Sequence, residues 1–160
     1  MQIMKPPSDS QLLAMTANLM VLSRAYRGAA DKALADFGLS QATAWPVILT
    51  GRLGDGVRQG ALADALGVEG PSLVRVLDQL VSAGLLERRE DPQDRRARTI
   101  HLTPAGQILR ERVESVLVQL RRQLFQDVSE TDLDICLRTF EHLKHALGRT
   151  SAASLKDLQS

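Results

Sequence analysis

The sequence predicts a mainly α-helical protein with one small β-hairpin. Aromatic residues make up only 3% of the 160 residues, while leucine, alanine, glutamine, arginine and glutamate, which favour helices, are plentiful. Apolar residues recur at helical intervals over most of the chain, and a strand-like alternation replaces this spacing in residues 85–103. With 44% hydrophobic residues, the chain can form one domain around one main core.

The first predicted helix is long and amphipathic. Residues 8–10 supply candidate N-caps, and Gly38 is a candidate end. The apolar residues between them follow a helical spacing: Leu12, Leu19, Leu22, Tyr26, Ala30 and Leu34. Ser40 can cap a second helix that runs to about Leu53, although Pro46 removes a backbone hydrogen bond inside it.

Two shorter helices follow, separated by a tight turn. The first is predicted around residues 62–66 and ends at Gly67, and the second begins near Pro71, which suits a first helical turn. The second helix has an apolar face and a polar face. These faces carry Leu73, Leu77, Leu80 and Val81, and Ser72, Arg75, Asp78 and Gln79, respectively. The pattern is that of a helix-turn-helix, although an ordinary helical hairpin explains these residues equally well.

A β-hairpin is predicted after Gly84. The segments LLERRE and ARTIHLT alternate in character, so Ile100 and Leu102 are expected to point inward and Thr99 and His101 outward. The DPQD segment between them has the composition of a turn, and arginines surround it. A hairpin directly after a helix-turn-helix is the order of a winged helix.

Two further helices complete the chain. Their predicted caps are Thr103 with Pro104 and Ser129 with Asp132. Their apolar stripes are Leu109, Val113, Val116, Leu117, Leu120 and Leu124, then Leu133, Leu137, Phe140, Leu143 and Leu147. These stripes exceed what a small winged-helix core can cover. We therefore expect dimerisation helices at 8–38 and 104–148, a winged helix-turn-helix core at 39–103, and flexible termini at 1–7 and 149–160.

Composition points to a cytoplasmic protein that is not an enzyme. No apolar run approaches the ~18 residues of a membrane span, the first residues lack the order of a signal peptide, and the single cysteine, Cys136, excludes an internal disulfide framework. No phosphate-binding loop, zinc-protease motif or nucleophile elbow occurs, and no cofactor is expected. The net charge of +1 does not by itself indicate nucleic acid, so the distribution of charge must decide.

The stretch GALADALGVEGPSLVRVLDQLVSAGLLERREDPQDRRARTIHLTPAG, residues 60–106, resembles the winged-helix core of MarR-type transcriptional regulators. GVEGPSLVRVLDQL is similar to the SlyA branch, and the wing turn at Asp94 to Arg96 and the following LTPAG are the most specific matches. The resemblance implies a homodimer on a pseudo-palindromic site in double-stranded DNA. It implies repression that a small aromatic anion relieves, or activation by displacement of nucleoid proteins. Gly60 and Ala61 depart from the family, where an apolar residue and a glutamine are more common.

The candidate DNA-binding residues lie on the second short helix and on the wing. Pro71, Ser72, Arg75 and Gln79 are expected at the major groove, where Arg75 could read guanine, the alternative being a surface ion pair with Asp78.

On the wing, Arg96 is expected in the minor groove, with Asp94 orienting its guanidinium, and Arg95 and Arg98 on phosphates. The remaining acids of the hairpin are expected to pair with Arg88 and Arg89 in solvent: Glu87, Glu90 and Asp91.

The resemblance also implies an effector pocket between the dimerisation helices and the winged helix. The candidates to line it are Met20, Tyr26, Trp45 and Ile48, with Arg24 or Arg27 to meet a carboxylate. Core packing of Trp45 and ordinary surface charge explain the same residues.

Two alternatives remain open. A metal-sensing regulator of the same fold would use His142 and His145, with Cys136 or Glu141, although such spacing is common on exposed helix faces. A winged helix that binds proteins and not DNA is disfavoured by the basic wing. The hypothesis that Cys136 is a sensor thiol is weaker still, because an apolar-rich helix usually buries such a side chain.

Overall fold

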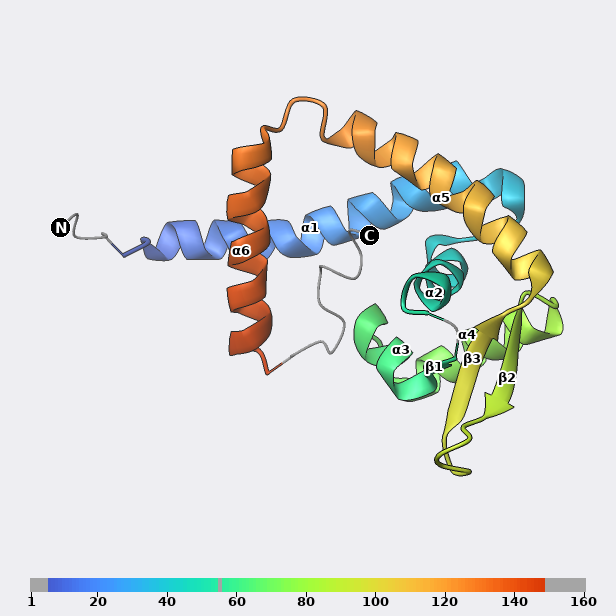
Figure 1. Ribbon diagram of the computed structural model, residues 1–160. Helices are drawn as coiled ribbons and strands as arrows, with labels where there is room; N and C mark the ends of the chain where they lie inside the picture. Colours follow the sequence, from blue (N-terminus) through green and yellow to red (C-terminus); the bar gives the residue numbers. More distant parts are fainter. Residues whose placement is uncertain (1–5, 55, 149–160) are drawn as a thin grey trace.

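The computed structural model describes residues 6–54 and 56–148, and the predicted mainly α fold with a hairpin is confirmed (Figure 1). The elements run in the order α1 (Asp9–Leu34), the 3-10 helix η1 (Ala35–Phe37), α2 (Gln41–Arg52), β1 (Val57–Arg58), α3 (Gln59–Leu66), α4 (Gly70–Ser82), β2 (Leu86–Glu90), β3 (Arg98–Leu102), α5 (Pro104–Leu124) and α6 (Glu130–Ala146). The termini predicted to be flexible, 1–7 and 149–160, lie almost wholly outside the described residues.

The helices begin where their caps were predicted. The side chains of Ser8, Ser40, Thr103 and Ser129 each accept a hydrogen bond from the backbone N–H three residues later, which satisfies one of the free donors of a first helical turn. Gly67 ends α3 in the left-handed conformation, at a φ of 67° that few other residues adopt. Local sequence therefore determines most helix boundaries.

The strands of the described chain form one antiparallel sheet in the order β1–β3–β2. The hairpin of β2 and β3 is as predicted, with Leu86 opposite Leu102 and Glu90 opposite Arg98. Two residues, Val57 and Arg58, make up β1, and the sequence did not predict this strand because two residues show no alternation.

The winged-helix core packs α2, α3, α4, β2 and β3 around a cluster of aliphatic side chains. Leu73, Leu77 and Leu80 on α4 are all at most 2% exposed, so the predicted apolar face of this helix is confirmed. Leu86 and Ile100 from the hairpin are in the same cluster. The polar face of α4 is consequently directed away from the core.

The prediction that Thr99 and His101 point into solvent is wrong. They lie on the face of β3 opposite to Ile100, as alternation requires, yet only 7% and 9% of their surfaces are exposed. The segment before β1 covers this face, since a Cβ on Gly56 would lie 3.1 Å from the His101 ring. Thr99 Oγ1 lies 3.0 Å from His101 Nε2, within hydrogen-bonding distance.

A second buried cluster joins the end of α1 to α2 and α5. It contains Ala30, Leu34, Ala44, Ile48, Val113 and Leu117. Trp45 packs against both clusters. Pro46 is buried within α2, and its carbonyl accepts a hydrogen bond of 2.8 Å from Thr50 Oγ1. The helix therefore continues through the proline.

α5 also makes a close contact with the end of the segment that leads into β2. A Cβ on Gly106 would lie only 2.0 Å from the carbonyl oxygen of Leu85, which leaves space for glycine alone. Thr103 Oγ1 donates a hydrogen bond of 2.6 Å to the Gly84 carbonyl. The first turn of α5 is thus fixed to the chain between α4 and β2.

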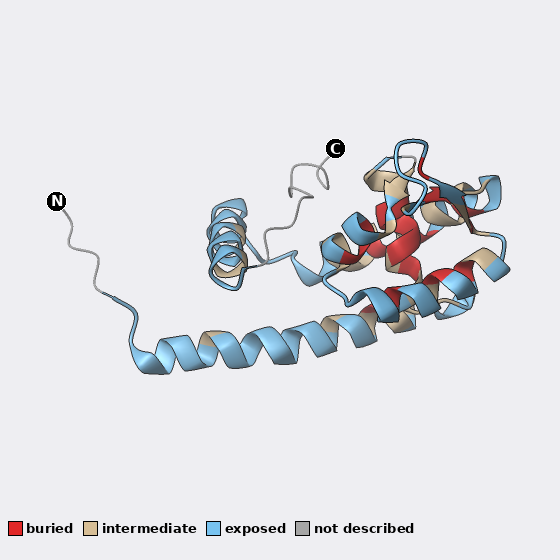
Figure 2. Ribbon diagram, turned by 90° about the horizontal axis from the view of Figure 1, so that it is seen from below, coloured by how far each residue is buried: buried red, intermediate tan, exposed pale blue. Residues whose placement is uncertain are grey.

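The N-terminal half of α1 and all of α6 project from this core, and Figure 2 shows them as exposed. The residues of α6 include none that is buried. Large apolar side chains are nevertheless exposed on both helices: Leu12, Leu13, Leu19, Met20, Val21 and Leu22 on α1, and Leu133, Ile135 and Phe140 on α6. Among the helices of the described ranges, none has both the length and the hydropathy needed to cross a membrane.

Candidate nucleic-acid interface

The exposed face of α4 carries the four residues that the sequence assigned to a DNA groove. Pro71, Ser72, Arg75 and Gln79 are all exposed. The alternative ion pair between Arg75 and Asp78 is not formed, because Asp78 pairs instead with Nη1 of Arg88 from β2. The Arg75 guanidinium is therefore left available on the surface of the helix.

The same ion pair corrects the prediction for Arg88, which was expected to pair with acids of the hairpin. Its second nitrogen, Nη2, lies 3.4 Å from the Val74 carbonyl oxygen of α4. Arg88 thus connects the hairpin to the middle of α4.

The wing loop between β2 and β3 is a closed turn held by its own backbone. Asp91 N–H donates to the Ala97 carbonyl at 3.2 Å, Asp94 N–H to the Asp91 carbonyl at 3.2 Å, and Ala97 N–H to the Asp94 carbonyl at 2.9 Å. The Asp91 carboxylate accepts a further bond of 2.8 Å from Gln93 N–H. The arginines of the wing are consequently carried by an ordered loop.

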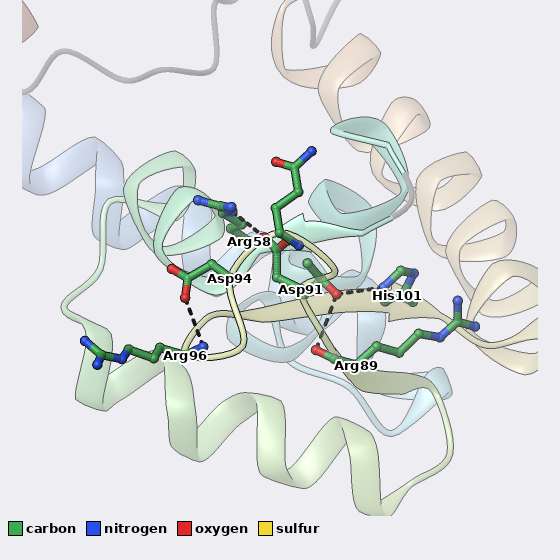
Figure 3. A network of polar contacts seen from close by, with 8 residues as sticks. Arg58, Arg89, Asp91, Asp94, Arg96 and His101 are labelled. Atoms are coloured by element: carbon green, nitrogen blue, oxygen red, sulfur yellow. Dashed lines mark hydrogen bonds and ion pairs between the residues drawn. The ribbon is translucent and has the colours of Figure 1, made fainter.

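Asp94 does not orient the Arg96 guanidinium as predicted. Its Oδ1 accepts a hydrogen bond of 3.0 Å from the backbone N–H of Arg96, and the Arg96 side chain extends away from it (Figure 3). The carboxylate therefore determines the backbone conformation of the turn, a common use of aspartate in turns, and leaves the guanidinium exposed.

Asp91 is a second correction, because it was expected to be a solvated acid of the hairpin. Its side chain is only 8% exposed and forms an ion pair of 2.7 Å with Arg58 Nε from β1 (Figure 3). The hydrogen bond from Gln93 N–H lowers the pKa of Asp91 below 3.8, and the neighbouring Arg58 lowers it further, against the opposing effect of burial. The carboxylate is therefore ionised at neutral pH.

The other acids of the hairpin pair in solvent. Arg89 pairs with Glu87, as predicted. Arg98, predicted to contact phosphate, pairs with Glu90 at 3.1 Å, and both side chains are more than half exposed. Such exposed pairs contribute little and exchange easily for a phosphate partner, so Arg98, like the exposed Arg95 and Arg96, can still meet a nucleic-acid backbone.

Two small cavities lie beside Trp45, between α2 and the helices α1 and α5. One, of about 200 Å³, is lined by Trp45, Ile48, Arg52, Glu114 and Arg121. The other, of about 190 Å³, is lined by Tyr26, Gln41, Trp45 and Leu117. Tyr26, Trp45 and Ile48, three of the residues expected to line an effector pocket, thus lie at these cavities.

The cations at these cavities differ from those expected. Arg24 and Arg27 are exposed and line neither cavity, and Met20 is 71% exposed. Arg52 and Arg121 line a cavity instead, with Arg52 Nε 2.8 Å from Glu114 Oε1. Their helical spacing could have identified them, since Arg52 is two turns after Trp45 and Arg121 is one turn after the core residue Leu117.

A family model described as MarR family matches residues 37–97 of the chain. The crystal structure of the transcriptional regulator PA3341 is similar at 35% identity and a TM-score of 0.72, covering 88% of this chain and 98% of that one. The chain belongs to the MarR family.

Two further solved structures of similar fold carry ligands. CouR from Rhodococcus jostii RHA1, bound to p-coumaroyl-CoA, has 26% identity and a TM-score of 0.71, covering 85% of this chain and 92% of that one. The S. aureus MepR–DNA complex has 24% identity and a TM-score of 0.71, covering 88% and 96%, and shows the fold alone.

Within this MarR-family chain, the residues considered for metal binding do not come together. The described residues contain no cluster of three or more histidine, cysteine, aspartate or glutamate side chains that could hold a metal ion. His142 and His145 are exposed on α6. Cys136 is also exposed, so its expected burial does not occur within the single chain. Gly60 and Ala61, which depart from the family pattern, lie in the first turn of α3, which forms despite the absence of a side-chain cap.

Proposed function

We propose that this MarR-family regulator reads a specific DNA sequence with the exposed face of α4 and the arginines of the wing. The observation that carries the proposal is that arginines are exposed and held on ordered backbone at both candidate surfaces, α4 and the wing. Arg75 is exposed and has no ion pair with Asp78, and Arg95 and Arg96 project from a turn that its own hydrogen bonds hold. Exposed guanidinium groups on ordered backbone can meet base edges and phosphates without a cost for ordering the backbone.

The division of roles follows from position. Pro71, Ser72, Arg75 and Gln79 on a helix can enter the major groove, where bidentate arginine contacts distinguish guanine. The wing carries Asp94, Arg95, Arg96 and Arg98, of which Arg96 is assigned to the minor groove and Arg95 and Arg98 to phosphates. Asp94 acts on the turn and not on DNA.

The protein is proposed to act as a homodimer. Its interface is assigned to the exposed apolar residues of α1 and α6, because they are numerous and nothing in the described chain covers them. The dimerisation helices then extend over residues 8–38 and 104–148, around a DNA-binding core at 39–103. Two copies related by a two-fold axis bind a pseudo-palindromic operator in double-stranded DNA. Such a regulator acts in the cytoplasm, beside the chromosome.

A small aromatic anion is the proposed effector. One of the cavities beside Trp45 combines the indole with the cations Arg52 and Arg121, of which Arg52 pairs with Glu114, and CouR, at 26% identity, is bound to p-coumaroyl-CoA. Release from DNA on binding makes the protein a repressor, and the similarity of GVEGPSLVRVLDQL to the SlyA branch adds activation by displacement of nucleoid proteins. Trp45 is the single tryptophan, so titration with aromatic carboxylates should change its fluorescence while acetate should not.

Selection of bound sites from random DNA by the purified full chain tests the function directly. A recovered motif with two-fold symmetry is expected, and recovery of random sequence contradicts the proposal. Arg75→Ala should cost about 1 to 3 kcal/mol on the selected site and flatten preference at one position in each half-site. Arg98→Ala, the control, should weaken all sequences alike and reduce the salt dependence.

A further inference from the structure

Two arginines flank the central strand of the sheet at the same level. Arg58 of β1 and Arg89 of β2 are both register partners of Thr99 in β3, and their side chains are 52% and 57% exposed. They carry the same charge at equivalent positions, yet their partners differ. Arg89 pairs with Glu87 of its own strand, whereas Arg58 pairs with Asp91, the first residue of the wing loop.

The Asp91 carboxylate joins two parts of the molecule. Its Oδ1 accepts a bond of 2.8 Å from Gln93 N–H inside the wing turn, and its Oδ2 meets Arg58 Nε at 2.7 Å. Arg58 is directly followed by α3, the first helix of the helix-turn-helix. One nearly buried carboxylate therefore connects the wing turn to the start of the DNA-binding helices.

Among the described residues, the ion pair with Arg58 is the one side-chain hydrogen bond or ion pair that joins the wing loop to residues 56–66. Arg58, Asp91 and Gln93 line an open cavity of about 650 Å³ with Thr99 and His101 on its floor. The remaining lining groups are Gly56, Arg89, Glu90 and Pro92. Because this side of the loop faces an open cavity, packing contributes less to its position than it would in a closed core. The ion pair at its rim is the direct side-chain connection between Arg58 and the loop.

We propose that Arg58 is a positioning residue for DNA recognition, which through Asp91 fixes the wing relative to the helix-turn-helix so that Arg95 and Arg96 reach the minor groove in register with α4. The proposal rests on the proposed DNA-binding function. Arg58 contacts no base in this role. Without Arg58, the described residues hold the wing only through β2 and β3, and ordering the loop on DNA then costs conformational entropy at binding.

The matched arginines give a sharp test: Arg58→Gln against Arg89→Gln, each in the full chain. Both changes remove one positive charge from the same face of the sheet, so both should reduce the salt dependence of binding to random DNA equally. Only Arg58→Gln should flatten the preference at the flanking positions of the selected site that the wing contacts, by about fivefold or more. Preference at the central positions read by α4 should be unchanged in both. Arg58→Lys, which can still reach Asp91, should recover part of the flanking preference.

A second measurement needs no DNA. Hydrogen exchange of the wing amides, those of Asp91 and residues 93–97, should be faster in Arg58→Gln than in wild type and unchanged in Arg89→Gln. Equal exchange in the two variants, or equal flanking preference, overturns the positioning role and leaves an ordinary ion pair. A wild-type protein that selects no DNA site would instead refute the proposed function, while the exchange experiment would still decide whether Arg58 holds the wing.

Discussion

The winged helix and the terminal helices use similar apolar patterns with different results. In the winged helix, every leucine of the stripe at 73, 77 and 80 is at most 2% exposed, because α2, α3 and the hairpin surround it. In α6, the stripe has comparable residues, but Leu133 and Phe140 are each 36% exposed, and Ile135, which lies outside the stripe, is 48% exposed. An amphipathic pattern thus predicts a helix in both regions, whereas burial depends on whether the same chain supplies an opposing surface.

The largest expected difference between the regions concerns unfolding. Leu77→Ala should lower the free energy of unfolding by about 2 to 5 kcal/mol, because it leaves a cavity in a packed cluster. Ile135→Ala should cost less, and its cost should depend on protein concentration, because its partners are proposed to lie on a second chain. Urea denaturation at several protein concentrations measures both. A concentration-independent loss of equal size for the two variants would remove the distinction between the regions.

Dimer formation is the next test. Phe140→Asp places a charge in the proposed interface twice, once for each subunit, and should raise the dimer dissociation constant by about 100-fold or more. Sedimentation should show monomer, with the helical circular dichroism of the winged helix retained. Thr139→Asp, the neighbouring position, is the control that adds the same charge at a polar residue. If Phe140→Asp remains dimeric at low concentration, α6 is not the interface.

Within the wing, substitution of Asp94 should have a smaller effect, and this effect is on DNA binding. Asp94→Ala removes the acceptor for Arg96 N–H and should weaken operator binding by about 0.5 to 1.5 kcal/mol, although the loss of a negative charge favours DNA. Asp94→Asn keeps an acceptor oxygen and also removes the charge, so it should bind at least as tightly as wild type. Operator titrations of the three proteins decide the matter. Tighter binding by Asp94→Ala would show that the carboxylate only repels DNA.

The smallest expected effect is a dependence of wing stability on pH that is confined to acidic solution. The pKa of Asp91 is lowered in the folded protein, chiefly by the hydrogen bond from Gln93 N–H. The ionised carboxylate therefore stabilises the wing fully above pH 3.8, and this stabilisation is lost as pH falls through the lower folded value. Arg58, bonded to it, and the cavity neighbours Arg89, Glu90 and His101 are the charged or titratable groups around it. The pH dependence of hydrogen exchange in the wing should differ between wild type and Asp91→Asn only below this pH. A difference that begins near neutral pH would assign the effect to another group.

The sequence predicted most of the fold because its signals are local. The effect of a cap residue such as Ser40 or Thr103, or of a glycine such as Gly67, is confined to one helical turn. Such residues can therefore be recognised from the sequence alone. Strand alternation correctly placed Ile100 and Thr99 on opposite faces. It failed for Thr99 and His101 because alternation says which residues share a face, and only the path of a distant segment, here Gly56, says whether that face is covered.

The candidate site was predicted with less success wherever partners are far apart in sequence. Asp91 is separated from Arg58 by 33 positions, and Arg88 reaches Asp78 across the turn before β2. Nothing in the charge pattern of the hairpin distinguishes Asp91 from Glu87, although one is nearly buried and the other is paired in solvent. In the cavity, helical spacing from Trp45 and Leu117 points to Arg52 and Arg121, but whether these two cations line the same cavity depends on how α2 and α5 pack.

Gly106 gives α5 a mechanical property. Because the helix contacts the Leu85 carbonyl with no intervening side chain and buries Val113 and Leu117 in the second cluster, it is held both at its first turn and near its middle. From Leu117 to Leu124 the helix axis extends only about 10 Å further at 1.5 Å per residue. The winged helix therefore sets the direction in which α5 leaves the core, and a side chain added at Gly106 would change that direction and with it the position of the α6 end.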